Sequence, residues 1–360
     1  MTLVSSPAAV AARDMRSPST GMVGASLSAV LAIAARERQP DGNCQVEGLR
    51  MTQGYAHQPV MVDEVVEAFR PVPDGLLVDA TVGGGGHTRA VLEARSGMRA
   101  VGIDRDPAAL RAAGEALASM GDRVRLVQAR FDALGEIVAG DADVTAVLFD
   151  LGVSSPQLDE PSRGFSYREA GPLDMRMGEG QDRTAADVVN TYPPERLAAL
   201  FRANGETRFA MRIARALVAA RPVEDTATLA EIVRSAIPAA ARRHGGHPAR
   251  RVFQAIRIEV NGELDALAAA LPVALDVLAP GGRLAVISYH SGEDRIVKAA
   301  FTNAATGGCT CPPGLPCVCG AVVVHRLVFR GSRGPNAAEV AANHRAESAR
   351  LRVIERTGPA

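Results

Sequence analysis

Four short apolar runs, separated by polar turns and helical patterns, follow one another in the first half of this chain. The runs cover residues 76–78, 99–103, 124–128 and 144–151. Between them, residues 88–95 and 107–120 have helical spacing, and the second of these segments begins with Pro107, which favours a first helical turn. Strands that alternate with helices are typical of a parallel sheet covered on both faces. We therefore predict a doubly wound α/β sheet.

The alternation stops after the fourth run. Residues 159–257 look helical and polar and lack apolar strands, whereas residues 283–289 read as a fifth strand that follows a Pro-Gly-Gly turn at 280–282. Residues 322–329 and 351–354 are candidates for two final antiparallel strands. We predict a core of residues 51–158 and 258–360, interrupted by a helical insertion of residues 159–257 that recognises the substrate.

Composition excludes some classes of protein. Hydrophobic residues make up 47% of the 360-residue chain, the formal net charge is zero, and no apolar run reaches the length of a membrane span. Residues 1–50 are predicted to be a weakly ordered leader or an over-long start, with Met51 as the natural start. Because the short apolar stretch at 21–35 matches a signal peptide poorly, we expect a cytoplasmic protein rather than a secreted or membrane protein.

A glycine loop follows the first run, in the sequence LVDATVGGGGHT at residues 77–88. A phosphate-binding P-loop needs Lys and then Ser or Thr after its glycines, but here His87 follows the last glycine. The dinucleotide pattern G-x-G-x-x-G fits poorly, because Thr88 stands where the third glycine belongs. A third candidate ligand is S-adenosylmethionine, which has no phosphate.

Polar and aromatic residues at the ends of the next runs favour this third ligand. Asp104 ends the second run, where a carboxylate can accept both ribose hydroxyls, and Phe131 follows the third run, where it can flank an adenine. Asp150 ends the fourth run. The alternative is that the glycines form only a turn and that the acids cap helices.

Several motifs further along the chain resemble one family in particular. They are DLGVSSPQLD at 150–159, RGFS at 163–166, GPLDMRM at 171–177, HPAR at 247–250, FQAIRI at 253–258, VN at 260–261, LAPGGRL at 278–284, SYHS at 288–291 and EDRIVK at 293–298. In this order they resemble the bacterial 16S ribosomal RNA cytosine-N4 methyltransferases. The resemblance implies a Rossmann-like class I methyltransferase fold, S-adenosylmethionine as the donor, and a cytosine in the decoding region of 16S rRNA, in the small ribosomal subunit, as the acceptor.

The resemblance also assigns cofactor contacts by position. They fall on Gly85, Gly86, His87, Asp104, Phe131, Asp150 and Gln157. Two departures from the family pattern stand out. Residues 1–50 have no counterpart in that pattern, and Gly292 occupies a position where leucine is expected.

Transfer of a methyl group to an exocyclic amine needs an acceptor for the amine hydrogens. We predict that Asp150 fills this role, with His290 as a second catalytic candidate, although a histidine after a strand is more often structural. The chain lacks the Pro-Pro-aromatic motif common in DNA amino-methyltransferases, so a base must stack elsewhere, with Phe165, Tyr167 and Tyr289 as candidates. A DNA methyltransferase and a non-catalytic RNA-binding module remain the alternatives.

Arginines gather in the predicted insertion. Residues 202–257 hold eleven arginines and four acids, a balance of 11 − 4 = +7 in a neutral chain. The arginines at 208, 212 and 215 can share a helical face, and those at 242, 243, 250 and 251 cluster with His244 and His247 around a Gly-Gly turn. Such a patch suits RNA phosphates, although a solvated helix face is the plainer interpretation.

Four of the five cysteines lie within eleven residues, at positions 309, 311, 317 and 319. Four thiolates can bind zinc, but the C-x-C spacing and the prolines between the pairs favour a reduced cysteine-rich turn without metal. The sequence leaves open both the zinc alternative and whether the chain forms a homodimer.

Overall fold

The computed structural model describes residues 59–141, 143–178, 180–241, 247–312 and 318–358. The predicted leader of residues 1–50 therefore lies outside the described residues, as do Arg242, Arg243, His244 and Cys317. Among the described residues, no helix is both long enough and apolar enough to cross a membrane.

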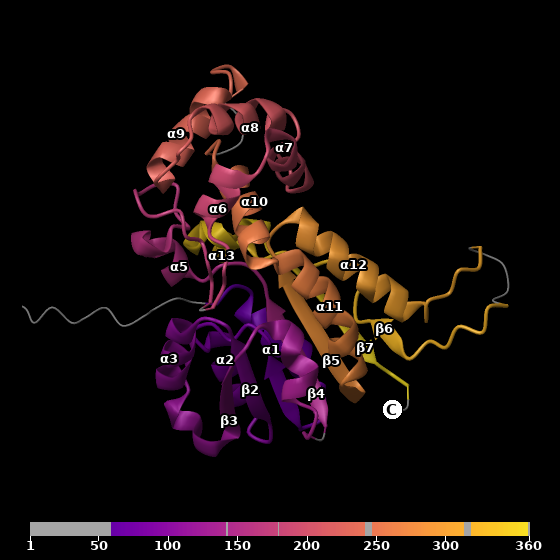
Figure 1. Ribbon diagram of the computed structural model, residues 1–360. Helices are drawn as coiled ribbons and strands as arrows, with labels where there is room; N and C mark the ends of the chain where they lie inside the picture. The colour runs from indigo at the N-terminus through magenta and orange to yellow at the C-terminus, as the bar shows by residue number, and fades with distance from the viewer. Residues whose placement is uncertain (1–58, 142, 179, 242–246, 313–317, 359–360) are drawn as a thin grey trace, which may run out of the picture. The chain divides into compact units, whose positions relative to one another are not determined.

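The described strands form one sheet in the order β3-β2-β1-β4-β5-β7-β6 (Figure 1). Their bounds are Leu76–Asp79 (β1), Arg99–Asp104 (β2), Val124–Gln128 (β3), Val144–Asp150 (β4), Leu278–Ser288 (β5), His325–Leu327 (β6) and Arg350–Arg356 (β7). Strands β1 to β5 are parallel, and β7 pairs antiparallel with both β5 and β6. The doubly wound sheet and the two final antiparallel strands are confirmed.

Alternate side chains of the strands point to opposite faces of the sheet, and helices cover both faces. Leu77 and Leu148 pack with α1 (Val62–Phe69) and α2 (Gly86–Ala94). On the other face, Val78 and Phe149 pack with α11 (Glu263–Asp276) and α12 (Ser291–Ala305). The remaining short core helices are α3 (Pro107–Ala116), α4 (Leu134–Ile137), α5 (Ser155–Asp159) and α13 (Ala337–Ala342). The result is a sheet between two helical layers.

Two strands differ in extent from the prediction. β5 begins at Leu278 rather than at residue 283, because Leu278 already pairs with Val144 before the chain loops out and resumes pairing at Arg283. The predicted Pro-Gly-Gly turn is this irregularity, with Gly281 at a φ of 79° that favours glycine. β6 is shorter than the predicted 322–329, because only His325–Leu327 pairs with β7.

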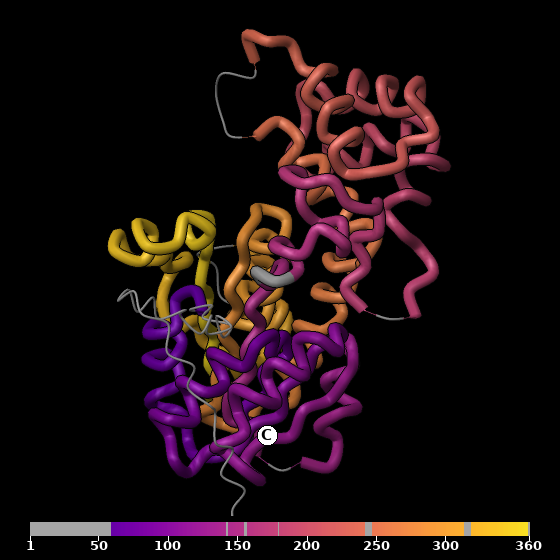
Figure 2. The backbone as a smooth tube through the Cα atoms, turned by 90° about the vertical axis from the view of Figure 1, so that its left-hand side faces the viewer, coloured from indigo at the N-terminus to yellow at the C-terminus, as the bar shows by residue number. Residues whose placement is uncertain are grey.

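A helical insertion separates β4 from β5, as predicted (Figures 1 and 2). Its helices are α6 (Ala185–Thr191), α7 (Pro194–Ala203), α8 (Ala210–Ala219), α9 (Thr226–Ala236) and α10 (Arg250–Asn261). These helices bury their own apolar core, in which Phe201, Leu217 and Val233 are fully covered. The predicted boundary at residue 257 falls inside α10, which is one continuous helix that runs into α11 across Gly262.

Asn261 joins this insertion to the loop that leads into it. Its side-chain oxygen accepts a hydrogen bond from Met177 N–H at 2.9 Å, and its amide donates to the carbonyl oxygens of Met175 at 2.8 Å and Arg257 at 2.9 Å. The side chain is buried and fully bonded, so it fixes the 175–177 segment against the end of α10.

Candidate cofactor and substrate site

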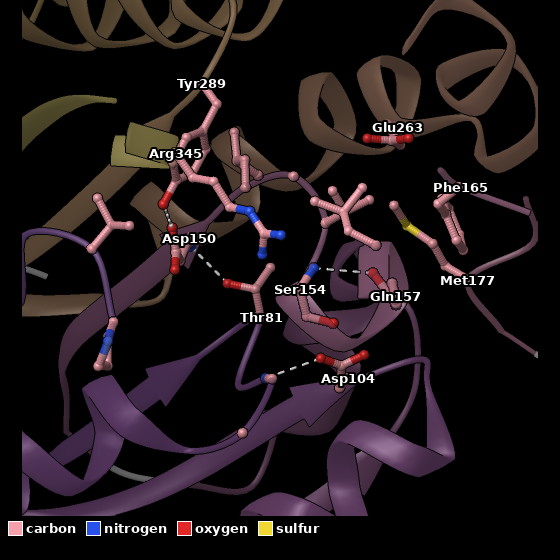
Figure 3. A pocket seen from close by; sticks show the side chains of 18 of the residues that line it. Thr81, Asp104, Asp150, Ser154, Gln157, Phe165, Met177, Glu263, Tyr289 and Arg345 are labelled. Carbon is pink, nitrogen blue, oxygen red and sulfur yellow. Dashed lines mark hydrogen bonds between the residues drawn. The ribbon is translucent and has the colours of Figure 1, made fainter. Parts of the chain in front are cut away.

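A cavity of about 1080 Å³ lies at the carboxyl ends of the parallel strands. Its walls include the glycine loop, the ends of β2 and β4, and residues of α10 and of the loops of the insertion (Figure 3). Strand order reverses between β1 and β4, and such switch points are where open α/β sheets bind ligands. With one exception, Gly85, the predicted site residues line this cavity.

The glycine loop presents bare backbone to the cavity. Gly83 has a φ of 51°, and a Cβ placed on it would meet no atom closer than 3.9 Å, so the constraint on Gly83 is conformational. Gly86 lines the cavity and permits close packing of Pro59, whose Cγ would lie 2.3 Å from an added Cβ. Gly85 instead packs against Leu117 at the N-cap of α2, away from the cavity lining.

Two threonines and a buried acid, which the sequence did not single out, hold this loop in place. Thr88 Oγ1 donates to Asp79 Oδ2 at 2.6 Å, and Thr81 N–H lies 3.3 Å from Asp79 Oδ1. Burial raises the pKa of Asp79, although Thr88 lowers it in part. Thr81 Oγ1 also accepts from Asp150 N–H at 2.7 Å, which links the end of β4 to the loop.

Asp104 lies at the end of β2 with its carboxylate against the loop. Its two oxygens accept hydrogen bonds from Gly83 N–H at 3.0 Å and from Asp106 N–H at 2.9 Å. Burial raises the pKa of Asp104 to about 6, against the lowering effect of these two bonds. A carboxylate in this position, with lone pairs still available, can accept hydrogen bonds from a diol.

Phe131 and Gln157 both line the cavity. Phe131 begins a short 3₁₀ turn and meets Phe149 edge to face, with ring centroids 5.6 Å apart. Gln157 is buried, donates to Asp106 Oδ2 at 3.0 Å and accepts from Ser154 N–H at 3.1 Å. Although burial alone would raise the pKa of Asp106, hydrogen bonds from Gln157, Ala108 and Arg163 hold that pKa below its usual value. Gln157 is therefore fixed by an ionised partner.

The fold brings the side chains of Tyr289 and His87 to Asp150. Tyr289 Oη donates to Asp150 Oδ1 at 2.8 Å (Figure 3). His87 Nδ1 lies 3.6 Å from Asp150 Oδ2. His87 Nε2 is 2.9 Å from the carbonyl oxygen of Val60, which can only accept, so this nitrogen carries a proton. His87 Nδ1 then faces Asp150 as an acceptor when the ring is neutral. Burial, followed by the charge of Asp150, raises the pKa of Tyr289 well above its usual value.

His290 caps a helix. Its Nδ1 accepts from the N–H groups of Gly292 at 3.1 Å and Glu293 at 3.4 Å, at the start of α12. Its Nε2 lies 3.1 Å from Glu293 Oε1, at ion-pair distance but without hydrogen-bond geometry. The ring therefore caps α12 through Nδ1 and also lines the cavity, and its catalytic role stays a prediction.

The three aromatic side chains named as candidates for stacking a base all line the cavity. Tyr167 stacks on His247, with centroids 4.5 Å apart and planes 16° from parallel. Phe165 is buried, and Tyr289 is engaged through its hydroxyl with Asp150. Phe165 belongs to the apolar core of the insertion, and Tyr167 packs against that core.

A cationic side chain from the far end of the chain also reaches the cavity. Arg345, in the 3₁₀ helix His344–Ser348, donates to Asp159 at 2.8 Å, and Figure 3 shows its side chain extending into the cavity near Asp150. Glu339 in α13 accepts from Met61 N–H at 2.6 Å, which anchors this segment beside α1. No local sequence signal separates Arg345 from the other surface arginines.

A buried ion pair joins the insertion to the core at the cavity wall. Arg257 of α10 makes two bonds of 2.8 Å to the Glu263 carboxylate of α11, and both side chains are 12% exposed. Burial raises the pKa of Glu263 even with Arg257 beside it. This pair joins two helices, α10 and α11, that both contribute residues to the cavity lining.

Exposed arginines continue from the cavity over the insertion. Arg250 lines the cavity mouth, and Arg208, Arg212 and Arg215 are exposed at or near α8. Arg251 is 3.9 Å from Glu206 and is also exposed. These five arginines of the predicted patch lie at the surface, as expected.

Comparison with known proteins matches residues 54–357 to a family model described as the MraW methylase family. Ribosomal RNA small subunit methyltransferase H of Thermobifida fusca is 53% identical over 84% of this chain and 94% of its own. The protein of the same name from Heliobacterium modesticaldum is 50% identical over 84% and 99%. Among solved structures, an rRNA methylase from Streptococcus thermophilus covers 82% of this chain and 94% of its own at 14% identity, with a TM-score of 0.36 too low to carry weight.

The buried ion pair gives a stability prediction. Glu263→Met leaves the Arg257 guanidinium buried without its partner, and we expect it to lower the free energy of unfolding by about 3–5 kcal/mol in urea titrations. The double variant Arg257→Met/Glu263→Met is expected to recover most of that loss.

A matched control is the exposed pair Arg234–Glu231, at 2.6 Å, in α9. Glu231→Met is expected to change stability far less than Glu263→Met, because an exposed ion pair contributes little. Equal losses in Glu263→Met and Glu231→Met would show that the pair at the cavity wall has no special structural role.

Proposed function

The chain belongs to the MraW methylase family, and we propose that it transfers a methyl group from S-adenosylmethionine to the N4 amine of a cytosine in 16S rRNA of the small ribosomal subunit. Two relatives at 50% identity or more carry the name ribosomal RNA small subunit methyltransferase H. The observation that carries the proposal is one cavity in which Gly83, Asp104 and Asp150 converge beneath the arginine-bearing insertion.

The donor site fits a nucleoside sulfonium without phosphates. Asp104 offers an acceptor for ribose hydroxyls, Phe131 offers an aromatic flank for adenine, and the Gly83–Gly86 backbone leaves room for close approach. Gln157, fixed by Asp106, stands on the same side. When bound, S-adenosylmethionine supplies an electrophilic methyl group. The protein's part is to hold that group and the amine in line, because positioning contributes much of the gain in such reactions.

Asp150 is placed to accept a hydrogen from the cytosine amine. The amine lone pair is delocalised into the ring, so an acceptor for its hydrogens raises electron density on nitrogen as the new N–C bond forms. The hydrogen bond from Tyr289 fixes the orientation of the Asp150 carboxylate. One proton leaves the amine in the reaction, and we assign Asp150 as the group that takes it. His290, which caps α12, is assigned a positioning role.

The insertion is proposed to hold RNA by its phosphates. Arg250 at the mouth and the exposed Arg208, Arg212 and Arg215 provide charges that neutralise a backbone without reading its sequence. Tyr167 and Phe165 provide flat apolar surface for the target base at the cavity. Phosphate contacts on the insertion and flat side chains at the cavity together suit an unstacked nucleotide that enters the cavity from the insertion side.

The proposal is tested by methyl transfer from labelled S-adenosylmethionine to small subunits, naked 16S rRNA and duplex DNA. We expect label on rRNA, at the N4 position of a cytosine after nuclease digestion and chromatography, and none with the Asp150→Asn variant. Label on DNA alone, or RNA binding without any transfer, would contradict the proposal.

The pKa of Asp104, about 6 in the free protein, makes donor binding depend on pH. Ribose hydroxyls donate to the ionised carboxylate, so protonation competes with binding. We expect the Kd for the donor to rise about tenfold between pH 7 and pH 5, because at one unit below the pKa about one molecule in ten is ionised.

Isothermal calorimetry at several pH values measures this dependence. Asp104→Asn is the control, and it is expected to bind weakly at every pH without the rise at low pH. A wild-type Kd that is constant from pH 7 to 5 would remove Asp104 from the donor site.

Removal of the Tyr289 hydroxyl is expected to slow transfer with little effect on donor affinity. Tyr289→Phe deletes a hydrogen bond to a carboxylate, and such bonds contribute about 1.5–3 kcal/mol. If that energy is used to orient Asp150, kcat falls about 10- to 100-fold. Single-turnover methylation of rRNA measures the rate.

Tyr192→Phe is the matched control, because Tyr192 Oη also donates to a carboxylate, that of Glu259, at 2.7 Å, but lies in the insertion. Equal rates for the two variants would mean that the Tyr289 hydroxyl does not position Asp150.

A further inference from the structure

A segment between α12 and β6 has no core of its own. We define the cysteine arm as residues 306–324, of which 306–312 and 318–324 are described. None of its described residues is buried, and Figure 1 shows the segment running out past the end of α12 before it returns to β6. Val318, Val322 and Val323 are 88%, 73% and 54% exposed, the largest exposures among the large apolar side chains in the described part of the chain. Apolar packing therefore cannot order this arm.

Three thiols nevertheless converge in the cysteine arm. The sulfur atoms of Cys309, Cys311 and Cys319 all lie within 4.8 Å of one another, and those of Cys309 and Cys319 are 3.5 Å apart. A disulfide would place them about 2.05 Å apart, so these two are not bonded to each other. Tetrahedral ligands at about 2.3 Å from a zinc ion are about 3.8 Å apart, which is close to the spacing found here.

The backbone around the thiols is shaped to hold them together. Val318 N–H lies 3.4 Å from Cys311 Sγ, a donor placed on a sulfur as in the outer shell of metal–thiolate sites. Gly308 and Gly320 flank Cys309 and Cys319 with φ angles of 70° and 72°, which let each cysteine follow a sharp turn. At the base of the arm, the carbonyl oxygen of Val322 would lie 2.4 Å from a Cβ on Gly307, so the outgoing and returning chains touch there.

We propose that Cys309, Cys311 and Cys319 bind one zinc ion, which orders the cysteine arm. Soft thiolate ligands select zinc over magnesium, calcium or manganese, and the three described thiolates supply three of its four ligands. The sequence alone favours a reduced turn, because C-x-C is not the usual spacing. In the structure, however, the sulfur atoms of Cys309 and Cys319 lie 3.5 Å apart, although the two residues are ten positions apart in the sequence. This proximity outweighs the argument from spacing. The inference is independent of the proposed methyl transfer, since the cysteine arm lies outside the cavity lining.

Metal analysis of the full-length protein, purified under reducing conditions without added metal, tests the proposal. We expect about one zinc per chain by plasma mass spectrometry in the wild type. Cys309→Ser/Cys311→Ser is expected to lose it, whereas Cys44→Ser, a thiol control far from the cysteine arm in the sequence, is expected to keep it. Cobalt(II) added after removal of zinc is expected to give sulfur-to-metal charge-transfer absorption in the wild type and in Cys44→Ser only.

Limited proteolysis gives a readout of order in the arm. Elastase, which cleaves after small apolar residues, is expected to cut within residues 306–324 at least tenfold faster after zinc is removed by a chelator. The proposal is overturned if the reduced wild-type protein binds neither zinc nor cobalt, or if Cys309→Ser/Cys311→Ser retains as much zinc as the wild type. An unchanged rate of cleavage on removal of bound zinc would overturn the ordering role.

Discussion

The parallel pairing of β1 with both β2 and β4 is the constraint on which the site depends. It brings the carboxyl ends of three strands to one edge, so that Asp79, Asp104 and Asp150 meet around the glycine loop. Each of these buried or half-buried acids accepts a hydrogen bond, which offsets the cost of placing the carboxyl groups close together. The donors include Thr88 for Asp79, Gly83 N–H for Asp104 and Tyr289 for Asp150. The same bonds that satisfy the acids also set the shape of the loop.

The insertion completes the cavity without disturbing this edge. Its apolar core is separate from the two cores of the sheet, and polar contacts join it to the sheet domain at the α10–α11 junction. Arg257 and Glu263 supply a bidentate ion pair there, and three hydrogen bonds of Asn261 hold the 175–177 segment of the insertion against the end of α10. A bidentate ion pair is directional, so it constrains the angle between α10 and α11. That angle sets the position of the arginine-bearing insertion relative to the donor site.

The sequence predicted the sheet and its strand ends because strands and helices leave periodic patterns and each strand end carries a distinctive residue. Asp104, Phe131 and Asp150 were singled out in this way, and the family resemblance added Gln157. What the sequence could not supply are contacts between distant residues. Tyr289 meets Asp150 across 139 residues, and Arg345 reaches the cavity from a short 3₁₀ turn that has no motif. The capping contacts of His290, whose Nδ1 accepts from two backbone N–H groups of α12, likewise have no signal in the sequence.

The most direct measurement is a crystal structure of the protein with S-adenosylhomocysteine and cytidine. The account predicts the ribose of the cofactor product at the Asp104 carboxylate, its backbone contacts along the Gly83–Gly86 loop, and the cytidine amine within hydrogen-bonding distance of Asp150. Cofactor product bound away from the glycine loop, or a cytidine amine that contacts no group at the end of β4, would contradict it.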